Sequence, residues 1–523
     1  MRRTVEVTVG VLLALVLGGL PMGPARAGET TWSSLKLQLS TPEGTPIQPP
    51  AVPPAGTMPL SLRDAIALAL KGNLDITVEG FNPQLRQQDL TSQKAVYDPS
   101  AFLELDRVNN ELPPTLNLLT GQRVLSDLAD FNVGLRQTLP TGGTYELRFN
   151  NQYNHNPQSG SSLPSTGFIS KFGITLTQPL LKNFGIEANE TNIRIAENNS
   201  GISQEQLRLR VSNVVTSIKT GYYDLTFAIQ NLAVQQRSLN LARELKTLNQ
   251  ARVRAGVAAP VEVTQAEAQE AAQLQNVITA EKAIRDAEDN LKVLMNLPLS
   301  GGWGQQLQPT DSPTFEVKTT NLDESIQRAL ENRYEYKSAK LDIDNKELSA
   351  RLARNQQLPD LNFVGSVFSN GFGQNFGKDM STMGSTDFIS YSVGVILTVP
   401  LGNRGPVAAY TKARLTEEQA KTSLKQLELQ ITQQVRQAIR QLEADAKRID
   451  ANRAARVLAE EQLRVETKRL EAGVSTTFNV LSFQRDLAAA QANEIQSLTD
   501  YNKDLANLDS VTGMVLDANR IQL

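Results

Sequence analysis

Hydrophobic and polar residues alternate along several short stretches of this chain. Every second residue is large and apolar from Phe172 to Leu176 and from Tyr391 to Val399, and similar patterns begin at Phe131 and Tyr145. Successive side chains of a β-strand point to opposite faces, so the pattern predicts strands within 100–180 and 360–400. Runs of about ten residues are typical of strands that cross an outer membrane, although a soluble sheet alternates too.

The connections between these predicted strands differ in length. Residues 111–127, 155–167 and 371–385 form long polar segments, whereas Pro140–Gly143 form a short turn. Outer-membrane barrels have long external loops and short periplasmic turns. The loop pattern therefore favours an outer-membrane β-barrel over a soluble sheet.

Two much longer segments, 187–254 and 406–471, contain no proline beyond Pro406 at the start of the second. Ile218, Leu225, Leu232 and Leu239 follow one another at intervals of seven, which predicts coiled-coil packing. Shorter helices are expected at 261–296 and 477–515, at 321–357, and at 60–96 with an interruption near Pro83. Each long helix would span about 100 Å, and one short helix from each half, stacked end to end, would match it. The predicted class is therefore membrane α+β, with a β-barrel continued by a long antiparallel coiled-coil helical barrel.

The chain also contains an internal duplication. LRDAIALAL at Leu62 recurs as LDESIQRAL at Leu322, GITLTQPL at Gly173 recurs as GVILTVPL at Gly394, and RVRAGV at Arg252 recurs as RLEAGV at Arg469. These matches define repeats at 60–298 and 321–516, a linker at 299–320 and a short tail at 517–523. Such a duplication indicates a protomer with internal pseudo-twofold symmetry.

The two repeats differ by one predicted hairpin. Pro99 and Pro179 are 80 positions apart, whereas Pro359 and Pro400 are 41 apart, and the difference of 39 residues corresponds to two strands and their loops. We expect the additional hairpin, at about 128–154, to join the barrel. The alternative is that it packs outside the barrel or projects from it.

The N-terminus has the features of an export signal. Arg2 and Arg3 precede an apolar run from Val7 to Leu20, and Ala25-Arg26-Ala27 follow as a small-x-small cleavage site. Residues 1–27 are therefore predicted to be a signal peptide, with a membrane-anchoring helix as the less favoured alternative. The proline-rich segment 28–59 is predicted to be extended. The net charge of −3 gives no basic footprint for nucleic acid, and the absence of cysteine excludes disulfides and thiolate sites.

Taken in order, these segments resemble TolC-type outer-membrane efflux and secretion channels over nearly the whole predicted mature chain. The resemblance rests on LSLRDAIALAL, LTQPLLKNFG, RAGVAAPVEVTQAEAQ, EAGVSTTFNVLSFQ and YNKDLANLDSVTG. It implies a homotrimer in the outer membrane of a Gram-negative-type bacterium, extending into the periplasm, with a periplasmic membrane-fusion adaptor and an inner-membrane transporter as partners. It also implies adaptor docking on the hairpin tips, which here are Ala255, Gly256, Val257, Ala472, Gly473 and Val474.

The resemblance also indicates candidates for the pore constriction. Asn479 and Ser482 occupy positions where the best-known member has carboxylates, and Glu262 and Ser475 occupy those of an acid–arginine link. Because the arginine is replaced by serine, we expect closure to depend more on packing near Phe478, Leu481 and Phe483 than on salt bridges. Six strands per protomer would give an eighteen-stranded trimer, where the familiar form has twelve.

Other functions find less support. His155, the only histidine, lies in a predicted polar loop, and Gly371–Gly377 lacks the spacing of a phosphate-binding loop. We therefore expect no catalytic site, no metal and no cofactor. A periplasmic coiled-coil scaffold and a stand-alone porin remain as alternatives to a channel that works with partners.

Overall fold

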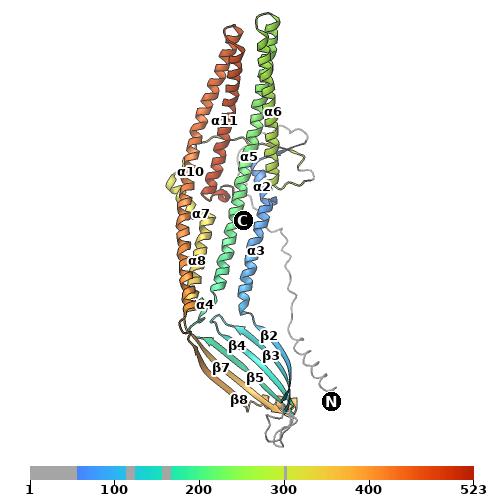
Figure 1. Cartoon of the computed structure of the whole chain (residues 1–523), viewed down its shortest axis with the longest axis vertical. Helices are drawn as coiled ribbons and strands as arrows, with labels where there is room; N and C mark the ends of the chain where they lie inside the picture. Colours follow the sequence, from blue (N-terminus) through green and yellow to red (C-terminus); the bar gives the residue numbers. More distant parts are fainter. Residues whose placement is uncertain (1–55, 113–123, 156–165, 300–302, 523) are drawn as a thin grey trace. The chain divides into compact units, whose positions relative to one another are not determined.

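The computed structural model describes residues 56–112, 124–155, 166–299 and 303–522. The predicted signal peptide and most of the proline-rich segment lie outside the described residues. Residues 56–518 belong to one structural unit. A helical part and a six-stranded sheet make up most of this unit (Figure 1). Among the described residues no helix is both long enough and apolar enough to cross a membrane.

Two pairs of short helices carry the duplicated sequence. The first pair is α2 (Leu62–Gly72) and α3 (Leu74–Lys94), and the second is α7 (Leu322–Asn332) and α8 (Tyr334–Asn355). The expected interruption near Pro83 is wrong, because Pro83 lies inside α3 and the break is at Asn73. The Asn73 side chain accepts a hydrogen bond from the amide of Ile76 at 3.2 Å and so starts the second helix.

Four long helices form two hairpins. The first consists of α5 (Thr191–Arg254), preceded by the short α4 (Ile186–Asn189), and α6 (Pro260–Leu294). The second consists of α10 (Arg404–Glu471) and α11 (Thr477–Val511), followed by α12 (Val515–Ala518). Near the sheet, neighbours follow in the order α3, α5, α8, α10; towards the hairpin ends the order is α6, α5, α11, α10 (Figure 1). The helices thus form a single layer whose edges are α3 and α6 on one side and α10 on the other.

Apolar side chains between these helices form the core. One buried cluster joins α7, α8, α10 and α11 around Ile431, Leu442 and Tyr501. A second lies nearer the hairpin ends around Leu245, Leu470 and Val480, and so joins α5 of the first hairpin to α10 and α11 of the second. The two hairpins are therefore packed against each other along the helical layer.

A small parallel ladder links the two repeats. Strand β1 (Thr57–Leu60) pairs with β6 (Gln306–Pro309), which lies in the segment predicted as a linker. The buried Tyr222 of α5 holds this ladder, because its hydroxyl donates to the Leu60 carbonyl at 3.0 Å and accepts from the Asp311 amide at 3.0 Å. Burial raises the pKa of Tyr222 to about 12, so it remains a neutral hydrogen-bonding group.

Six antiparallel strands form one sheet in the order β2, β3, β4, β5, β7, β8. Their bounds are β2 (Ser100–Leu112), β3 (Val124–Thr138), β4 (Thr144–His155), β5 (Thr166–Pro179), β7 (Asp360–Gly373) and β8 (Ile389–Thr398). The additional hairpin, β3 and β4, lies between β2 and β5 and pairs with both. The hairpin therefore belongs to the same sheet as the other four strands.

The strand register divides the sheet into two chemically different faces. We define the apolar face as the one that carries Leu103, Leu105, Leu147, Phe172, Ile174, Val367, Tyr391, Val393 and Val395. The polar face is the opposite one, which carries Glu104, Asn132, Arg148, Lys171, Ser366 and Ser392. One segment differs from the sequence prediction, because residues 371–385 are not all loop: they contain the helix α9 (Phe376–Gly384).

Candidate functional site: the hairpin tips

Each long hairpin turns through the same backbone motif. Gly256 has φ +75° and Gly473 has φ +73°, a left-handed conformation that glycine adopts at little cost. In the first turn the Gly256 amide donates to the Val253 carbonyl at 3.0 Å and the Val257 amide donates to the Arg252 carbonyl at 2.9 Å. Gly473 and Val474 make the equivalent bonds in the second turn. The two tips are thus geometric copies of each other.

The tip residues predicted for docking are accessible in this chain. Ala255, Gly256, Ala472 and Gly473 are exposed. Val257 and Val474 are 67% and 66% exposed, although valine is usually buried. Both tips therefore present a small apolar surface next to a rigid glycine turn.

A hydrogen-bond network joins the two hairpins just behind the tips. The buried Thr477 of α11 donates from its hydroxyl to Glu262 Oε2 of α6 at 2.7 Å. Asn249 of α5, also buried, donates to the Glu262 carbonyl at 3.2 Å and has its own Oδ1 3.2 Å from the Thr477 hydroxyl. A hydroxyl has one proton, so the shorter contact makes Glu262 its acceptor. We refer to Asn249, Glu262 and Thr477 as the tip link.

Ser475, which the sequence places opposite Glu262, belongs to a different network. Its hydroxyl donates to Glu466 of α10, and that carboxylate also accepts from Arg469 at 3.2 Å. Asn479 approaches the same carboxylate from α11 at 3.5 Å. The structure therefore does not bring Glu262 and Ser475 together: the first bonds across the hairpins, the second within one hairpin.

The remaining gate candidates lie on α11 in different environments. Phe478 is 62% exposed, whereas Leu481 is buried and Phe483 packs against the core cluster that joins the hairpins. Ser482 is half-buried. Sequence reasoning missed Thr477 and Asn249, because their importance depends on a contact between segments more than 200 positions apart. The only local signal is that each is a polar residue buried beside a tip.

Ionisable groups also gather between α10 and α11, away from the tips. Arg448 donates to the buried Asp445 at 2.6 Å and to Asp500 at 2.9 Å. Asp504 lies one turn further along α11, where burial, a hydrogen bond with Asp445 and the nearby negative charges raise its pKa to about 7. Two carboxylates thus bind one guanidinium, and the neighbouring Asp504 is protonated at mildly acidic pH.

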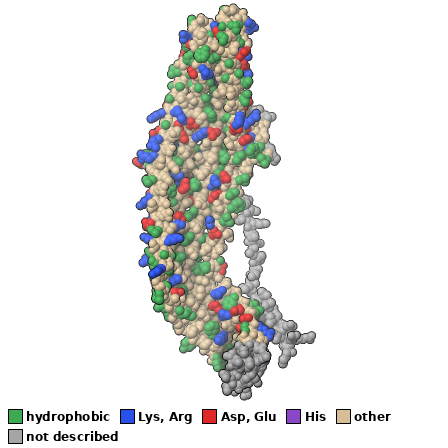
Figure 2. Space-filling model, in the orientation of Figure 1, with side chains coloured by type: hydrophobic (Ala, Val, Ile, Leu, Met, Phe, Trp, Pro, Cys, Tyr) green, Lys and Arg blue, Asp and Glu red, His purple; other side chains and the backbone are tan. Residues whose placement is uncertain are grey.

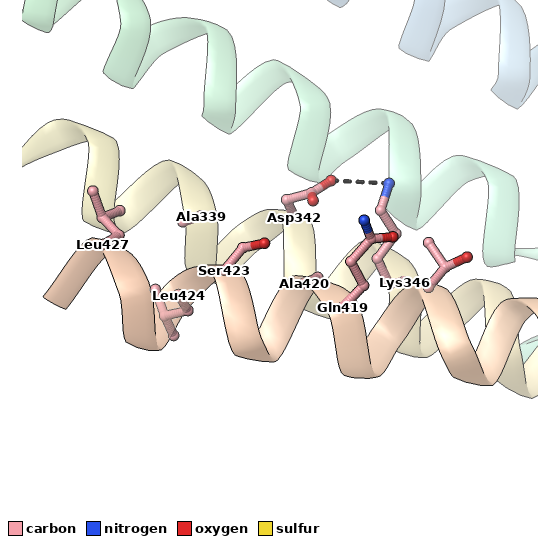
Figure 3. Close-up of a pocket in the computed structure, with 9 residues that line it drawn as sticks. Ala339, Asp342, Lys346, Gln419, Ala420, Ser423, Leu424 and Leu427 are labelled. Carbon is pink, nitrogen blue, oxygen red and sulfur yellow. Dashed lines mark ion pairs between the residues drawn. The ribbon is translucent and has the colours of Figure 1, made fainter. Parts of the chain in front are cut away.

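A shallow groove runs between α8 and α10 (Figure 3). Asp342 and Lys346 on one side form an ion pair at 3.2 Å, and the other side presents Gln419, Ser423 and Leu424. The only ionised groups of this lining are therefore paired with each other. Among the described residues no group of His, Asp and Glu is arranged to hold a metal.

His155 is the last residue of β4 rather than a loop residue, and its Nδ1 lies 2.8 Å from the hydroxyl of Thr166. On the side of the molecule in Figure 2, acidic and basic side chains are interspersed along the helices. This side of the described part of the chain therefore shows no basic patch of the kind that binds nucleic acid.

Comparison with known proteins identifies the same architecture. The model of the outer membrane efflux protein family matches residues 145–297 and 325–514. The efflux protein BepC of Brucella suis is 23% identical over 79% of this chain and 84% of its own length, and nodulation protein T of Rhizobium leguminosarum bv. viciae is 23% identical over 67% and 70%. Among solved structures, the outer membrane protein VceC of Vibrio cholerae superimposes with a TM-score of 0.63 at 14% identity, over 86% of this chain and 96% of that one. This chain therefore belongs to the outer membrane efflux protein family, whose members lie in the outer membrane and extend into the periplasm.

Proposed function

We propose that three copies of this chain assemble into a passive conduit that crosses the outer membrane and continues through the periplasm. In this proposal the conduit is the outer component of a tripartite efflux pump or type I secretion system. A periplasmic adaptor and an inner-membrane transporter dock with it and open it. Family membership supports the efflux channel. The unpaired edge strands of the sheet and the exposed apolar edges of the helical layer support the trimer.

Those edges are the observation that carries the proposal. The sheet ends at β2 on one side and β8 on the other, and each edge strand has one row of unpaired backbone groups. Every residue of β8 is exposed, including Tyr391 at 79% and Val393 at 72%. Exposed edges of this kind promote aggregation unless they are paired or the sheet closes. Pairing of β2 with β8 of the next copy closes a barrel of three times six, or eighteen, strands.

The helical layer has matching apolar edges. On α3, Leu74, Val78, Phe81 and Leu85 are all exposed, at 61%, 66%, 44% and 60%. Their spacing of four, three and four residues is that of a coiled-coil seam. On the opposite edge, Leu415 and Leu429 of α10 are 66% and 72% exposed. A cyclic trimer would pack α10 of one copy against α3 of the next and bury both rows.

The tips support the docking part of the proposal. Val257 and Val474 are exposed at two copies of one motif, so a trimer would present six similar apolar tips around its axis. Repeated equivalent sites suit a partner that binds in several copies. The tip link then holds the hairpins of each protomer together in the closed state, and docking releases it.

Cysteine cross-linking tests the assembly, because the natural chain contains no cysteine. Leu103→Cys in β2 combined with Val393→Cys in β8 should give disulfide-linked dimers and trimers in outer membranes. Phe172→Cys in the central strand β5 replaces Val393→Cys in the control, and that pair should remain monomeric. Neighbouring β8 positions, Tyr391 and Val395, cover a shift in register. Monomers at all three β8 positions would contradict the trimeric barrel.

Function requires two further measurements. Purified trimers of Thr477→Val, in which the tip link is released, should conduct ions in planar bilayers, since released trimers without conductance would indicate a periplasmic scaffold. A photo-cross-linking residue at Val257 or Val474 should capture a membrane-fusion adaptor, identified by mass spectrometry, whereas Val317 in the linker should not. Conductance without adaptor capture at either tip would indicate a stand-alone porin.

A further inference from the structure

The short helix α9 lies on the apolar face of the sheet. Ser369 of β7 donates from its hydroxyl to the Met383 carbonyl at 2.6 Å, and the ring of Phe376 meets that of Phe168 at 6.0 Å between centroids. Ser369 is opposite Phe172, and both belong to the apolar face. The α9 contacts of β5 and β7 are therefore on the side that carries the exposed leucines, valines and aromatic residues.

A buried carboxylate fixes this helix to the sheet. Asp379 is fully buried, with Oδ1 3.2 Å from the Ser170 amide and Oδ2 accepting from the Ser170 hydroxyl and from Asn151 Nδ2 at 3.2 Å. Ser170 and Asn151 are paired residues of the apolar face. Three donors thus satisfy a carboxylate that would otherwise be buried at high cost, and two polar side chains of the apolar face are covered.

Two glycines allow the close approach. A Cβ built on Gly371 would lie 2.6 Å from the Asp379 carbonyl oxygen, and one built on Gly373 would lie 2.4 Å from the Asp379 amide nitrogen. Neither glycine has a left-handed backbone, so contact with α9, not conformation, requires them. The docking of α9 is built into β7 itself.

The outer side of α9 is polar, while its surroundings on the sheet are apolar. Ser381 is two residues from Asp379, which places it about 200° around the helix, and both it and Lys378 are exposed. Beyond the helix on the same face, Phe172 and Ile389 are 45% and 56% exposed. A lysine avoids hydrocarbon, whereas the sheet beside it presents a surface suited to hydrocarbon.

We propose that α9 is a membrane-interface helix, which Asp379 docks on the lipid-facing side of the sheet and which lies in the headgroup layer of the outer leaflet. The apolar surface below α9 then contacts acyl chains, and Lys378 and Ser381 contact the polar headgroups. The helix marks where the hydrocarbon band ends on β5 and β7. This inference rests on the proposed placement of the sheet in the outer membrane.

Spin labels on single introduced cysteines measure the depth directly. Three variants of the full-length protein in phospholipid vesicles are compared: Val393→Cys on the apolar face, Ser381→Cys on α9 and Ala255→Cys at a tip. Power saturation with oxygen, which concentrates in hydrocarbon, and with a water-soluble nickel chelate gives a depth for each label. We expect the label at position 393 to lie in hydrocarbon and the label at position 255 to lie in water. The label at position 381 should lie at an intermediate depth, where both reagents reach it.

Each other outcome has a distinct meaning. If the label at position 393 lies in hydrocarbon but the label at position 381 is as accessible to water as the one at position 255, α9 lies in water and the interface helix is refuted. If Ser381 is as deep as Val393, α9 lies in the acyl region and the proposal is also refuted. If the label at position 393 itself lies in water, the proposed placement of the sheet in the membrane is refuted, and the interface helix is refuted with it.

Glycine variants test the docking without changing any charge. Gly371→Ala should push α9 off the sheet and shift the Ser381 label towards water. Gly394→Ala in β8 is the matched control, because its Cβ has no atom within 4 Å, and it should leave the depth unchanged. Asp379→Asn should act like Gly371→Ala, whereas Asp387→Asn in the same connection should not. An unchanged Ser381 depth in both Gly371→Ala and Asp379→Asn would refute the docking role of these residues.

Discussion

The tip link gives a quantitative prediction for channel opening. Thr477→Val removes the hydroxyl that donates to Glu262 but keeps the shape of a side chain that is 1% exposed. A hydrogen bond to a charged group contributes about 1.5–3 kcal/mol. Glu262 is half-buried, so water can replace the lost donor, and we expect the lower end of that range. Since about 1.4 kcal/mol is a factor of ten, each protomer should favour the open state about tenfold more.

A trimer multiplies this effect if it opens only when all three links are released. Three links of about 1.5 kcal/mol sum to about 4.5 kcal/mol, or about a thousandfold change in the opening equilibrium. Single-channel recording in planar bilayers measures this as open probability. Thr477→Val should raise the open probability strongly while the open-state conductance remains the same, because the substitution does not widen the open pore.

Ser475→Ala is the control for this prediction. Ser475 also bonds a carboxylate near a tip, but its partner Glu466 belongs to the same hairpin. We therefore expect Ser475→Ala to leave the open probability nearly unchanged. Equal opening in the two variants, or none in Thr477→Val, would refute the reasoning.

Phe478→Ala tests the hypothesis, drawn from the sequence, that packing closes the channel. Phe478 is 62% exposed in the protomer, so it contributes to closure only by packing against another copy.

Three further predictions concern stability. Burial and neighbouring carboxylates raise the pKa of Asp504 to about 7, above its value in the unfolded chain. The folded state therefore loses stability as the pH rises from about 4 to about 7. Asp504→Asn should raise Tm at pH 8 more than at pH 5. Tyr222→Phe should cost about 0.5–1.5 kcal/mol in denaturant titrations, because the Asp311 amide loses its acceptor and the Leu60 carbonyl keeps only its bonds from Thr310, whereas the half-buried Tyr223→Phe should cost less. Gly473→Ala should cost about 1–2 kcal/mol in thermal unfolding because of its positive φ, and Gly304→Ala, with ordinary φ and open space around its Cβ, should be neutral.

The sequence predicted those parts of the fold that repeat a local signal many times. Heptad spacing in α5 extends over 22 residues, from Ile218 to Leu239, and alternation in β5 and β8 fixes a strand within a few residues. The tip turns were readable because Gly256 and Gly473 each end a long helix. In all these elements, the local preference and the tertiary packing favour the same structure.

Elements that depend on a single residue or a distant partner were missed. Pro83 was expected to interrupt the first short helix, but the capping side chain of Asn73 decides where α3 begins. Strands β1 and β6 have four residues each and pair across about 250 positions, so neither has a local pattern. The helix α9 has one local signal, Asn375, whose side chain accepts from the Lys378 amide at 2.9 Å, but nine residues are too few for clear periodicity.

The two tips carry an acid and an amide in opposite order. The tip glycines are offset by 473 − 256 = 217 positions, and the same offset relates Asn249 to Glu466 and Glu262 to Asn479. The first tip thus has the amide before its turn and the acid after it, and the second tip has the reverse. This exchange explains why Glu262 is available to Thr477 across the hairpins, while Glu466 is occupied within its own hairpin.

A double-mutant cycle tests this explanation. Asn479→Glu alone places a second carboxylate beside Glu466, where the two side chains now approach to 3.5 Å, and repulsion at that distance costs about 1 kcal/mol or more near a surface. Adding Glu466→Asn restores an acid–amide pair in the order found at the first tip, so the double variant should recover most of the lost stability in thermal unfolding. If the two single effects simply add, the carboxylates do not interact, and the exchange has no bearing on which acid links the hairpins.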